Sequence, residues 1–135
     1  MSASDVTAVV DSSPELRVSA DHSSWSLGDQ QAIFQGDVEL VRGDVKLTCD
    51  RLELHHDSDG AVERAIATGT VRVEREAWQA SSDRAELDQN AGQLVLTGSP
   101  TLEEESKTLK GERISIALQG DSVSCEKCIL SVGAP

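Results

Sequence analysis

Residues 36–54 read GDVELVRGDVKLTCDRLEL, and the chain repeats the pattern of this stretch twice. In each copy a glycine opens a short run of alternating apolar residues, and an acidic residue precedes a second run. The later copies begin at Gly69, 33 residues after Gly36, and at Gly98, a further 29 residues along. An internal period near 30 residues is typical of one supersecondary unit stacked on copies of itself. We therefore expect a fold made of repeated strand units.

The composition favours a single β-rich domain. Hydrophobic residues make up 38% of the 135-residue chain but aromatic residues only 2%, so the core must be aliphatic, which suits pleated sheets. The formal net charge is −12, and the acidic residues are spread along the chain. Such a surface repels phosphate backbones, so nucleic acid is not an expected partner. The charge is interpreted mainly as a source of solubility.

Composition shifts near the two ends set the expected boundaries. Residues 1–15 are rich in Ser and Asp, which indicates a flexible N-terminal arm or edge strand, residues 16–132 form one β domain, and 133–135 are a tail. No apolar run approaches the ~18 residues of a membrane span, and the opening MSASD lacks the features of a signal peptide. Either the protein stays in the cytoplasm, or the chain is a mature or trimmed form.

Short alternating segments separated by turn signals predict an all-β protein. Most candidate strands have four to six residues, the usual length, and turns such as Gly43-Asp44 separate them. No segment keeps an apolar period of 3.6 residues long enough for a substantial helix. The expected strands cover residues 32–34, 38–41, 45–49, 52–55, 62–67, 71–75, 78–82, 85–88, 94–97, 101–104, 108–110, 114–118 and 123–130.

The parity of the apolar positions changes inside each repeat. Val45, Leu47 and Cys49 are odd-numbered, whereas the apolar residues after Asp50 are even-numbered. A strand has a side-chain period of two, so it can switch faces only at a bend or an inserted residue. A corner at each acidic residue predicts two facing antiparallel sheets, a β-taco or jelly-roll-like slab. The predicted corners are Asp21, Asp50, Asp83 and Glu112.

The corner carboxylates are interpreted as structural and not as catalytic. We expect them to accept backbone N–H hydrogen bonds of their own turns. Ser and Cys nucleophiles have no positioned His nearby in the sequence. His55 and His56 are adjacent on a strand and point to opposite faces, so they do not readily serve one metal ion. The sequence therefore predicts neither an enzyme nor a cofactor.

The pair Cys125 and Cys128 forms a Cys-x-x-Cys motif flanked by strand-like segments. A structural disulfide or paired thiols in a terminal hairpin is the favoured interpretation. Inert thiols, and metal or redox chemistry, remain as alternatives, although zinc needs about four ligands and a redox site favours a helix N-terminus.

The repeat resembles the OstA-like family, which includes the LptA-type lipopolysaccharide-transport proteins, LptC and the N-terminal part of LptD. The order of the motifs over about residues 16–118 carries the resemblance, and it is greatest to the LptA-type members. Cys49, Glu112 and Pro100 depart from the usual residues of the family pattern. The motifs are VSAD at 18–21, FQGDV at 34–38, LTCDRL at 47–52, ATGTV at 67–71, LTGSP at 96–100 and LKGERI at 109–114.

The resemblance implies an OstA fold in the periplasm that carries lipopolysaccharide toward the outer membrane. Its partners would be the acyl chains of lipid A, LptC-like and LptD-like domains, and further copies of itself stacked head to tail. An acidic protein is poorly suited to hold an anionic head group, whereas each CH₂ removed from water contributes ~0.8 kcal/mol. The alternative is a self-assembling β-solenoid scaffold, bactofilin-like, without lipid.

The expected lipid-binding groove lies between the sheets, with Phe34 near one mouth. For each lining residue, ordinary core packing is the competing interpretation. The predicted lining consists of Phe34, Val38, Leu40, Leu47, Leu52, Leu54, Ile66, Val71, Val73, Leu87, Leu94, Leu96, Leu102, Ile114 and Ile116.

Overall fold

The computed structural model describes residues 15–26 and 28–133, and this part of the chain consists of twelve β-strands and their turns. All pairings between the strands are antiparallel. The all-β class is therefore confirmed, and the two expected sheets are the facing halves of one folded twelve-stranded sheet. A helix long and apolar enough to cross a membrane is not found in the described ranges.

The strands follow one another closely along the chain. Four of them, β3 to β6, have eleven to fourteen residues, and the others have four or five. The strands are β1 (Leu16–Ser19), β2 (His22–Ser26), β3 (Gln31–Arg42), β4 (Val45–His56), β5 (Val62–Arg75), β6 (Trp78–Asp88), β7 (Gln93–Thr97), β8 (Thr101–Glu104), β9 (Lys107–Lys110), β10 (Arg113–Ala117), β11 (Ser122–Glu126) and β12 (Ile129–Val132).

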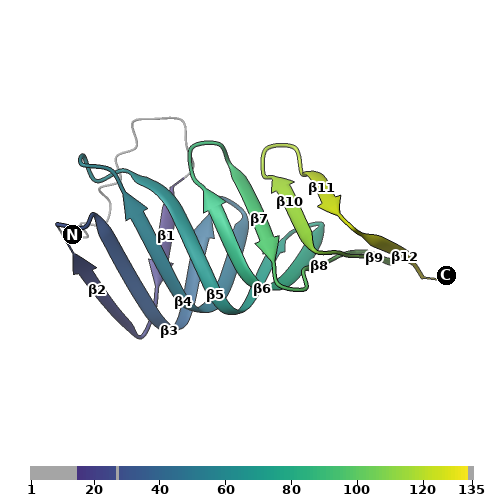
Figure 1. The fold of residues 1–135 in the computed structure, drawn as a ribbon, viewed down its shortest axis with the longest axis horizontal. Helices are drawn as coiled ribbons and strands as arrows, with labels where there is room; N and C mark the ends of the chain where they lie inside the picture. Colours follow the sequence, from purple (N-terminus) through teal and green to yellow (C-terminus); the bar gives the residue numbers. More distant parts are fainter. Residues whose placement is uncertain (1–14, 27, 134–135) are drawn as a thin grey trace.

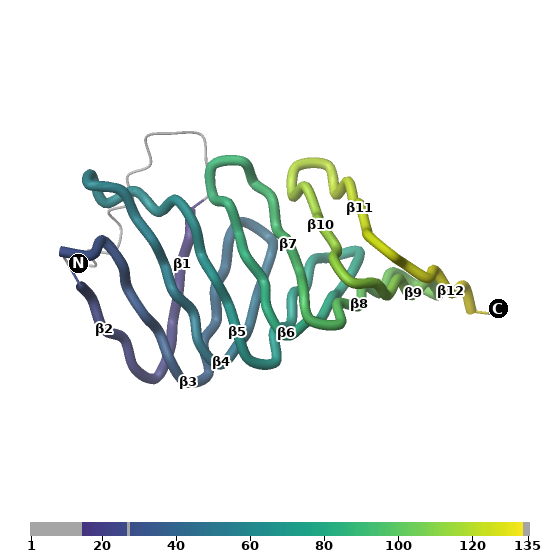
Figure 2. Tube along the Cα trace, viewed as in Figure 1, coloured from purple at the N-terminus to yellow at the C-terminus, as the bar shows by residue number. Residues whose placement is uncertain are grey.

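The four long strands run through both halves of a folded sheet. Half-sheet A contains β2, β7, β10 and β11 with one part of each long strand, and half-sheet B contains β1, β8, β9 and β12 with the other part. Figure 1 shows the strands side by side along the long axis, from β2 at the N-terminal end to β11 and β12 at the other. The tube in Figure 2 shows how each long strand bends between the halves.

The bends lie where the change of parity predicts them. The β3–β4, β4–β5 and β5–β6 ladders shift register between Gln35 and Val38, between Thr48 and Arg51, and between Thr68 and Val71. Extra residues at these bulges let both halves of a strand turn their apolar side chains inward. The predicted pairs of short strands are therefore continuous long strands bent at a bulge.

Two predictions about the short strands are wrong. β2 was not expected, because only Trp25 among its residues is strongly apolar. The single strand predicted for 123–130 is divided into β11 and β12, which belong to different half-sheets. The predicted arm at 1–15 lies outside the described residues, apart from Glu15.

Aliphatic side chains fill the space between the half-sheets. The largest fully buried ones come from both halves, among them Leu40 and Val73 of half-sheet B and Leu52 and Ile116 of half-sheet A. The low aromatic content is consistent with this core, in which Phe34 and Trp78 are the buried aromatic residues of the described chain.

Candidate functional site

The predicted groove lining lies in the core, with one exception. Fourteen of the fifteen residues are at most 8% exposed and belong to one hydrophobic cluster. They come from both half-sheets and extend from Phe34 on β3 to Ile116 on β10. The interior is thus a continuous aliphatic layer along the slab, and in this structure its side chains are packed against one another.

The exception is Ile66, whose predicted inward orientation is wrong. It pairs with Glu53 on β4 and Glu86 on β6, so it shares the outer face with these two acidic residues and is only half-buried. The inward positions of this part of β5 are taken by Ala65 and Ala67, which are buried opposite Leu54 and Leu52. Side-chain size suggested the wrong face of the strand.

The apolar layer remains exposed at both ends of the slab. At the N-terminal end, Trp25 pairs with the buried Ala32, is 62% exposed, and contacts Phe34 edge to face with ring centroids 6.1 Å apart. At the C-terminal end, Val123 pairs with buried Ile116, and Leu130 pairs with Leu109. Their exposed fractions are 38% and 59%. The predicted mouth at Phe34 therefore has an apolar counterpart at the opposite end.

The corner side of the slab is built from acidic residues placed against glycines. A Cβ added to Gly36 would lie 2.8 Å from Oδ2 of Asp21, and one added to Gly98 would lie 2.5 Å from Cβ of Asp83. The backbone N–H of Asp21 donates to the Gly36 carbonyl at 2.9 Å, and that of Asp83 to the Gly98 carbonyl at 3.0 Å. The predicted corner residues thus lie at the bends, in contact with the glycine of the following corner.

The last corner replaces the glycine with a disulfide. The N–H of Glu112 donates to the Glu126 carbonyl at 3.0 Å, which puts Glu126 where the other corners have Gly. Cys125 and Cys128 are joined across this turn, and both sulfur atoms lie against Gly111. Lys127 adopts a φ of 52° inside the turn, and the disulfide joins Cys125 on β11 to Cys128, the residue before β12.

The side opposite the corners, which we call the seam, is closed by polar contacts between the half-sheets. Arg42 at the end of β3 is only 6% exposed, and its Nε donates to Oε1 of Gln89 at 2.9 Å. A terminal nitrogen of Arg42 also donates to the Gln89 carbonyl oxygen at 3.4 Å. Burial lowers the pKa of Arg42, and the neighbouring Arg75 adds to this effect. A guanidinium therefore closes the seam beside the aliphatic layer.

Arg75 makes the second set of contacts across the seam. One terminal nitrogen donates to the Leu118 carbonyl and to Oδ1 of Asp121, both at 2.7 Å, while its Nε donates to Asp44 at 2.8 Å. The indole N–H of Trp78 donates to the same Asp121 oxygen at 3.2 Å. Half-sheet B is in this way bound to the β10–β11 turn of half-sheet A.

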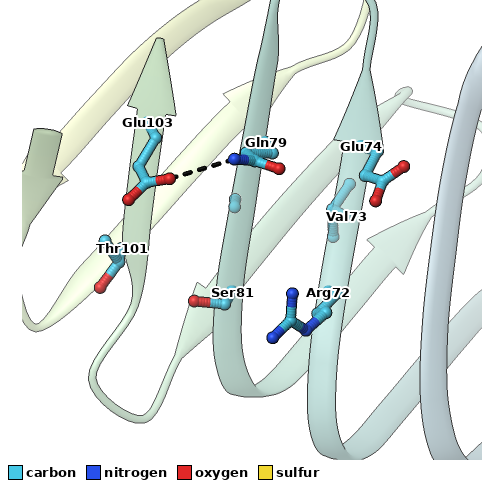
Figure 3. Close-up of a pocket in the computed structure, with 8 residues that line it drawn as sticks. Arg72, Val73, Glu74, Gln79, Ser81, Thr101 and Glu103 are labelled. Atoms are coloured by element: carbon cyan, nitrogen blue, oxygen red, sulfur yellow. Dashed lines mark hydrogen bonds between the residues drawn. The ribbon is translucent and has the colours of Figure 1, made fainter. Parts of the chain in front are cut away.

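The polar depression on the outer face is distinct from the interior. Figure 3 shows it over β5, β6 and β8, with Arg72, Ser81 and Glu103 among its lining residues and a 3.1 Å hydrogen bond from Gln79 to Glu103. Of its labelled side chains, Val73 belongs to the core. This shallow surface lacks the buried apolar lining expected for acyl chains.

The His, Cys, Asp and Glu side chains of the described ranges form no metal-binding cluster. No group of three or more His, Cys, Asp or Glu there could hold a metal ion. The Nε2 of His55 lies 3.3 Å from Glu53, and His56 lies near the Asp57 carbonyl. Hydrogen bonding from Arg51 lowers the pKa of Glu53. These are contacts of the outer face and its turns.

The sequence matches, over residues 17–121, the family described as LptA/(LptD N-terminal domain) LPS transport protein. The chain belongs to this family. The resemblance drawn from the repeat motifs is thereby confirmed. The description of the family is one of transport. A search of curated protein sequences found no match.

Among solved structures, the fold is similar to that of LptH from Pseudomonas aeruginosa, described as the LptA homologous periplasmic component of the conserved lipopolysaccharide transport device. The TM-score is 0.80 at 19% sequence identity, and the match covers 90% of this chain and 96% of the LptH chain. At this identity the likeness concerns the fold.

The seam residues of this LptA-type domain were missed at the level of sequence, although one signal was present. Arg42 has the same parity as the inward-facing Val38 and Leu40, and Arg75 has the parity of Val73. An arginine at the last inward position of a strand is a signal for a buried polar contact. Its partner in the other half-sheet could not be named without the fold.

Proposed function

We propose that this chain carries lipopolysaccharide through the periplasm, with the acyl chains held between the half-sheets. The observation that carries the proposal is the aliphatic layer, which runs the length of the slab and stays exposed at both ends through Trp25, Val123 and Leu130. Family membership over residues 17–121 supports the same cargo. Each buried CH₂ contributes ~0.8 kcal/mol, so a few partly inserted chains suffice for retention.

The charge of the protein supports retention through the chains and not through the head group. The formal net charge is −12, and an anionic phosphorylated glycolipid would be repelled by such a surface. The proposed periplasmic location is supported by the Cys125–Cys128 disulfide, because disulfides persist in oxidising compartments.

The edge strands β2, β11 and β12 are the proposed sites of head-to-tail assembly with copies of this chain and with LptC-like and LptD-like domains. An edge strand presents free backbone groups for strand addition. Leu130 and Val132 on β12 are exposed and lie on the same face of the strand, and Leu130 pairs with Leu109. Both residues therefore extend the inner face toward the next domain. Stacking would join the aliphatic layers of successive domains.

The scaffold alternative is favoured by one observation, the dense packing of the interior. Fourteen predicted lining residues are at most 8% exposed, and a bactofilin-like scaffold needs a filled interior. A lipid carrier with this structure must part its half-sheets to receive a chain. Lipid capture therefore separates the two functions.

The test is photocrosslinking in cells that make lipopolysaccharide. A photoreactive amino acid at Leu54 or Val73, both buried, is expected to form adducts with lipopolysaccharide. The matched control is Ile66, one strand position from the core but on the outer face, which should give little adduct. Equal labelling at Ile66 and Val73, or filaments without lipid adducts, would favour the scaffold.

A further inference from the structure

The two seam arginines occupy equivalent positions in successive repeats. Arg42 follows Gly36 by six residues, and Arg75 follows Gly69 by six. Their carbonyl partners are also equivalent, because Gln89 follows Gly69 by twenty residues and Leu118 follows Gly98 by twenty. In both cases the arginine of one repeat donates to the opposite half-sheet of the next repeat.

We propose that these contacts form a seam latch, which controls access of acyl chains to the interior from the side of the slab. The proposal rests on the proposed function for the identity of the cargo, but the mechanical role of the latch does not depend on it. The latch comprises the contacts of Arg42 with Gln89 and of Arg75 with Leu118 and Asp121, together with the hydrogen bond from Trp78 to Asp121.

The position of the latch supports this role. The corner side is held by continuous backbone through β3 to β6, so the half-sheets can separate only at the seam. The residues next to the latch belong to the aliphatic layer. On β3 the inward-facing Leu40 precedes Arg42, and the buried Val45 pairs with Arg42. Breaking the contacts at the seam would expose this layer without unpairing a strand.

The contacts of the latch are hydrogen bonds of a kind that can break and re-form. Its partners are an amide, two backbone carbonyls and one carboxylate that is partly exposed, with 42% of the Asp121 side chain accessible. Hydrogen bonds of this kind contribute a modest net amount each, because water replaces them when they break. Apolar side chains at the same positions would instead fuse the two edges into the core.

The first experiment measures opening without lipid. In a Trp25→Phe background, Trp78 is the single tryptophan and reports on the seam through its contact with Asp121. Arg42→Ser combined with Arg75→Ser is expected to raise the acrylamide quenching constant of Trp78 at least twofold. Arg72→Ser removes the same charge from the outer face of β5 and should leave the constant unchanged. An unchanged constant in the double variant overturns the latch.

The second experiment follows uptake of the apolar fluorescent probe N-phenyl-1-naphthylamine by stopped flow. The double variant Arg42→Ser with Arg75→Ser is expected to take up the probe about tenfold faster than the parent protein, while Arg72→Ser matches the parent. Covalent closure should give the opposite result. In a Cys49→Ser background, the substitutions Arg42→Cys and Gln89→Cys provide two thiols that a short bismaleimide joins. Uptake of the probe should be at least tenfold slower after joining than in the same variant before joining.

The outcomes separate the latch from the proposed function. Uptake that is unaffected by both loosening and covalent closure means that chains pass through the ends of the slab, and it overturns the proposal. If the parent protein binds neither the probe nor lipopolysaccharide, the proposed function fails, and the quenching of Trp78 still decides whether the latch holds the seam.

Discussion

The carboxylate of Asp50 lies against the α-carbon of Gly69, in the space that any side chain at position 69 would need. A Cβ added there would be 2.5 Å from Oδ2 and 2.7 Å from Cβ of Asp50. Gly69 also has a φ of +86°, which L-residues with side chains rarely adopt. Two independent constraints therefore select glycine at this corner.

Gly69→Ala should therefore destabilise the protein strongly. We expect a loss of about 2–4 kcal/mol in the free energy of unfolding, the sum of left-handed backbone strain and overpacking. Gly60→Ala is the matched control, because Gly60 has a φ of +89° but nothing within 4 Å of an added Cβ. That control should lose only about 1–2 kcal/mol. Equal losses in urea denaturation would show that the Asp50 contact is unimportant.

The buried thiol of Cys49 should make stability fall at alkaline pH. Desolvation raises its pKa from 9.0 to about 11, so the folded state keeps a proton that the unfolded state loses between these values. Below pH 9 the protonated thiol makes its full contribution to the free energy of unfolding. As the pH rises from 9 toward 11, the free energy of unfolding falls by about 1.4 kcal/mol per unit of pH. Cys49→Ala should remove this part of the slope. Parallel pH profiles for both proteins would contradict the assignment.

Loss of the disulfide should loosen the last corner more than the rest of the slab. Closing so short a loop is worth about 2 kcal/mol on the chain-entropy estimate. The double substitution Cys125→Ser with Cys128→Ser should therefore lower overall stability modestly. Hydrogen exchange should show faster exchange in β11 and β12, with β4 and β5 unchanged. Uniform acceleration across all strands would instead indicate that the bond supports the whole fold.

Head-to-tail assembly should depend on the inward-facing residue of the last strand. Leu130→Ser is expected to weaken self-association at least tenfold in analytical ultracentrifugation, because the joined apolar layer would be interrupted. Ile129→Ser is the control on the same strand, since Ile129 pairs with Lys110 on the opposite face and is 71% exposed. Equal effects of both substitutions would mean that general hydrophobicity, and not continuity of the interior, drives association.

Parity was sufficient to predict the corners but not the identity of every inward residue. The switch around Asp50 predicts a bend because a strand cannot change faces otherwise. In residues 62–67, however, apolar residues occupy both parities, and the larger Ile66 was assigned to the interior. The pairing of Ala65 with Leu54 decides the face, and such pairing depends on register with a distant strand.

The contacts between the half-sheets could not be predicted from the sequence, for a different reason. Arg42 and Gln89 are 47 residues apart, and their meeting depends on the accumulated twist of the strands between them. Similarly, β2 has little apolar alternation of its own and owes its place to backbone pairing with β3.

The offset of the seam contacts by one repeat sets a lower limit on the size of this architecture. Arg42 of one repeat meets Gln89 of the next, so a single repeat has no opposite edge to meet. A further unit like the one that begins at Gly69 would supply both a new arginine and a new acceptor, whereas the unit that begins at Gly98 has Glu104 at the arginine position. The number of seam contacts therefore follows the number of repeats that carry the arginine, and the repeat that begins at Gly98 ends the series.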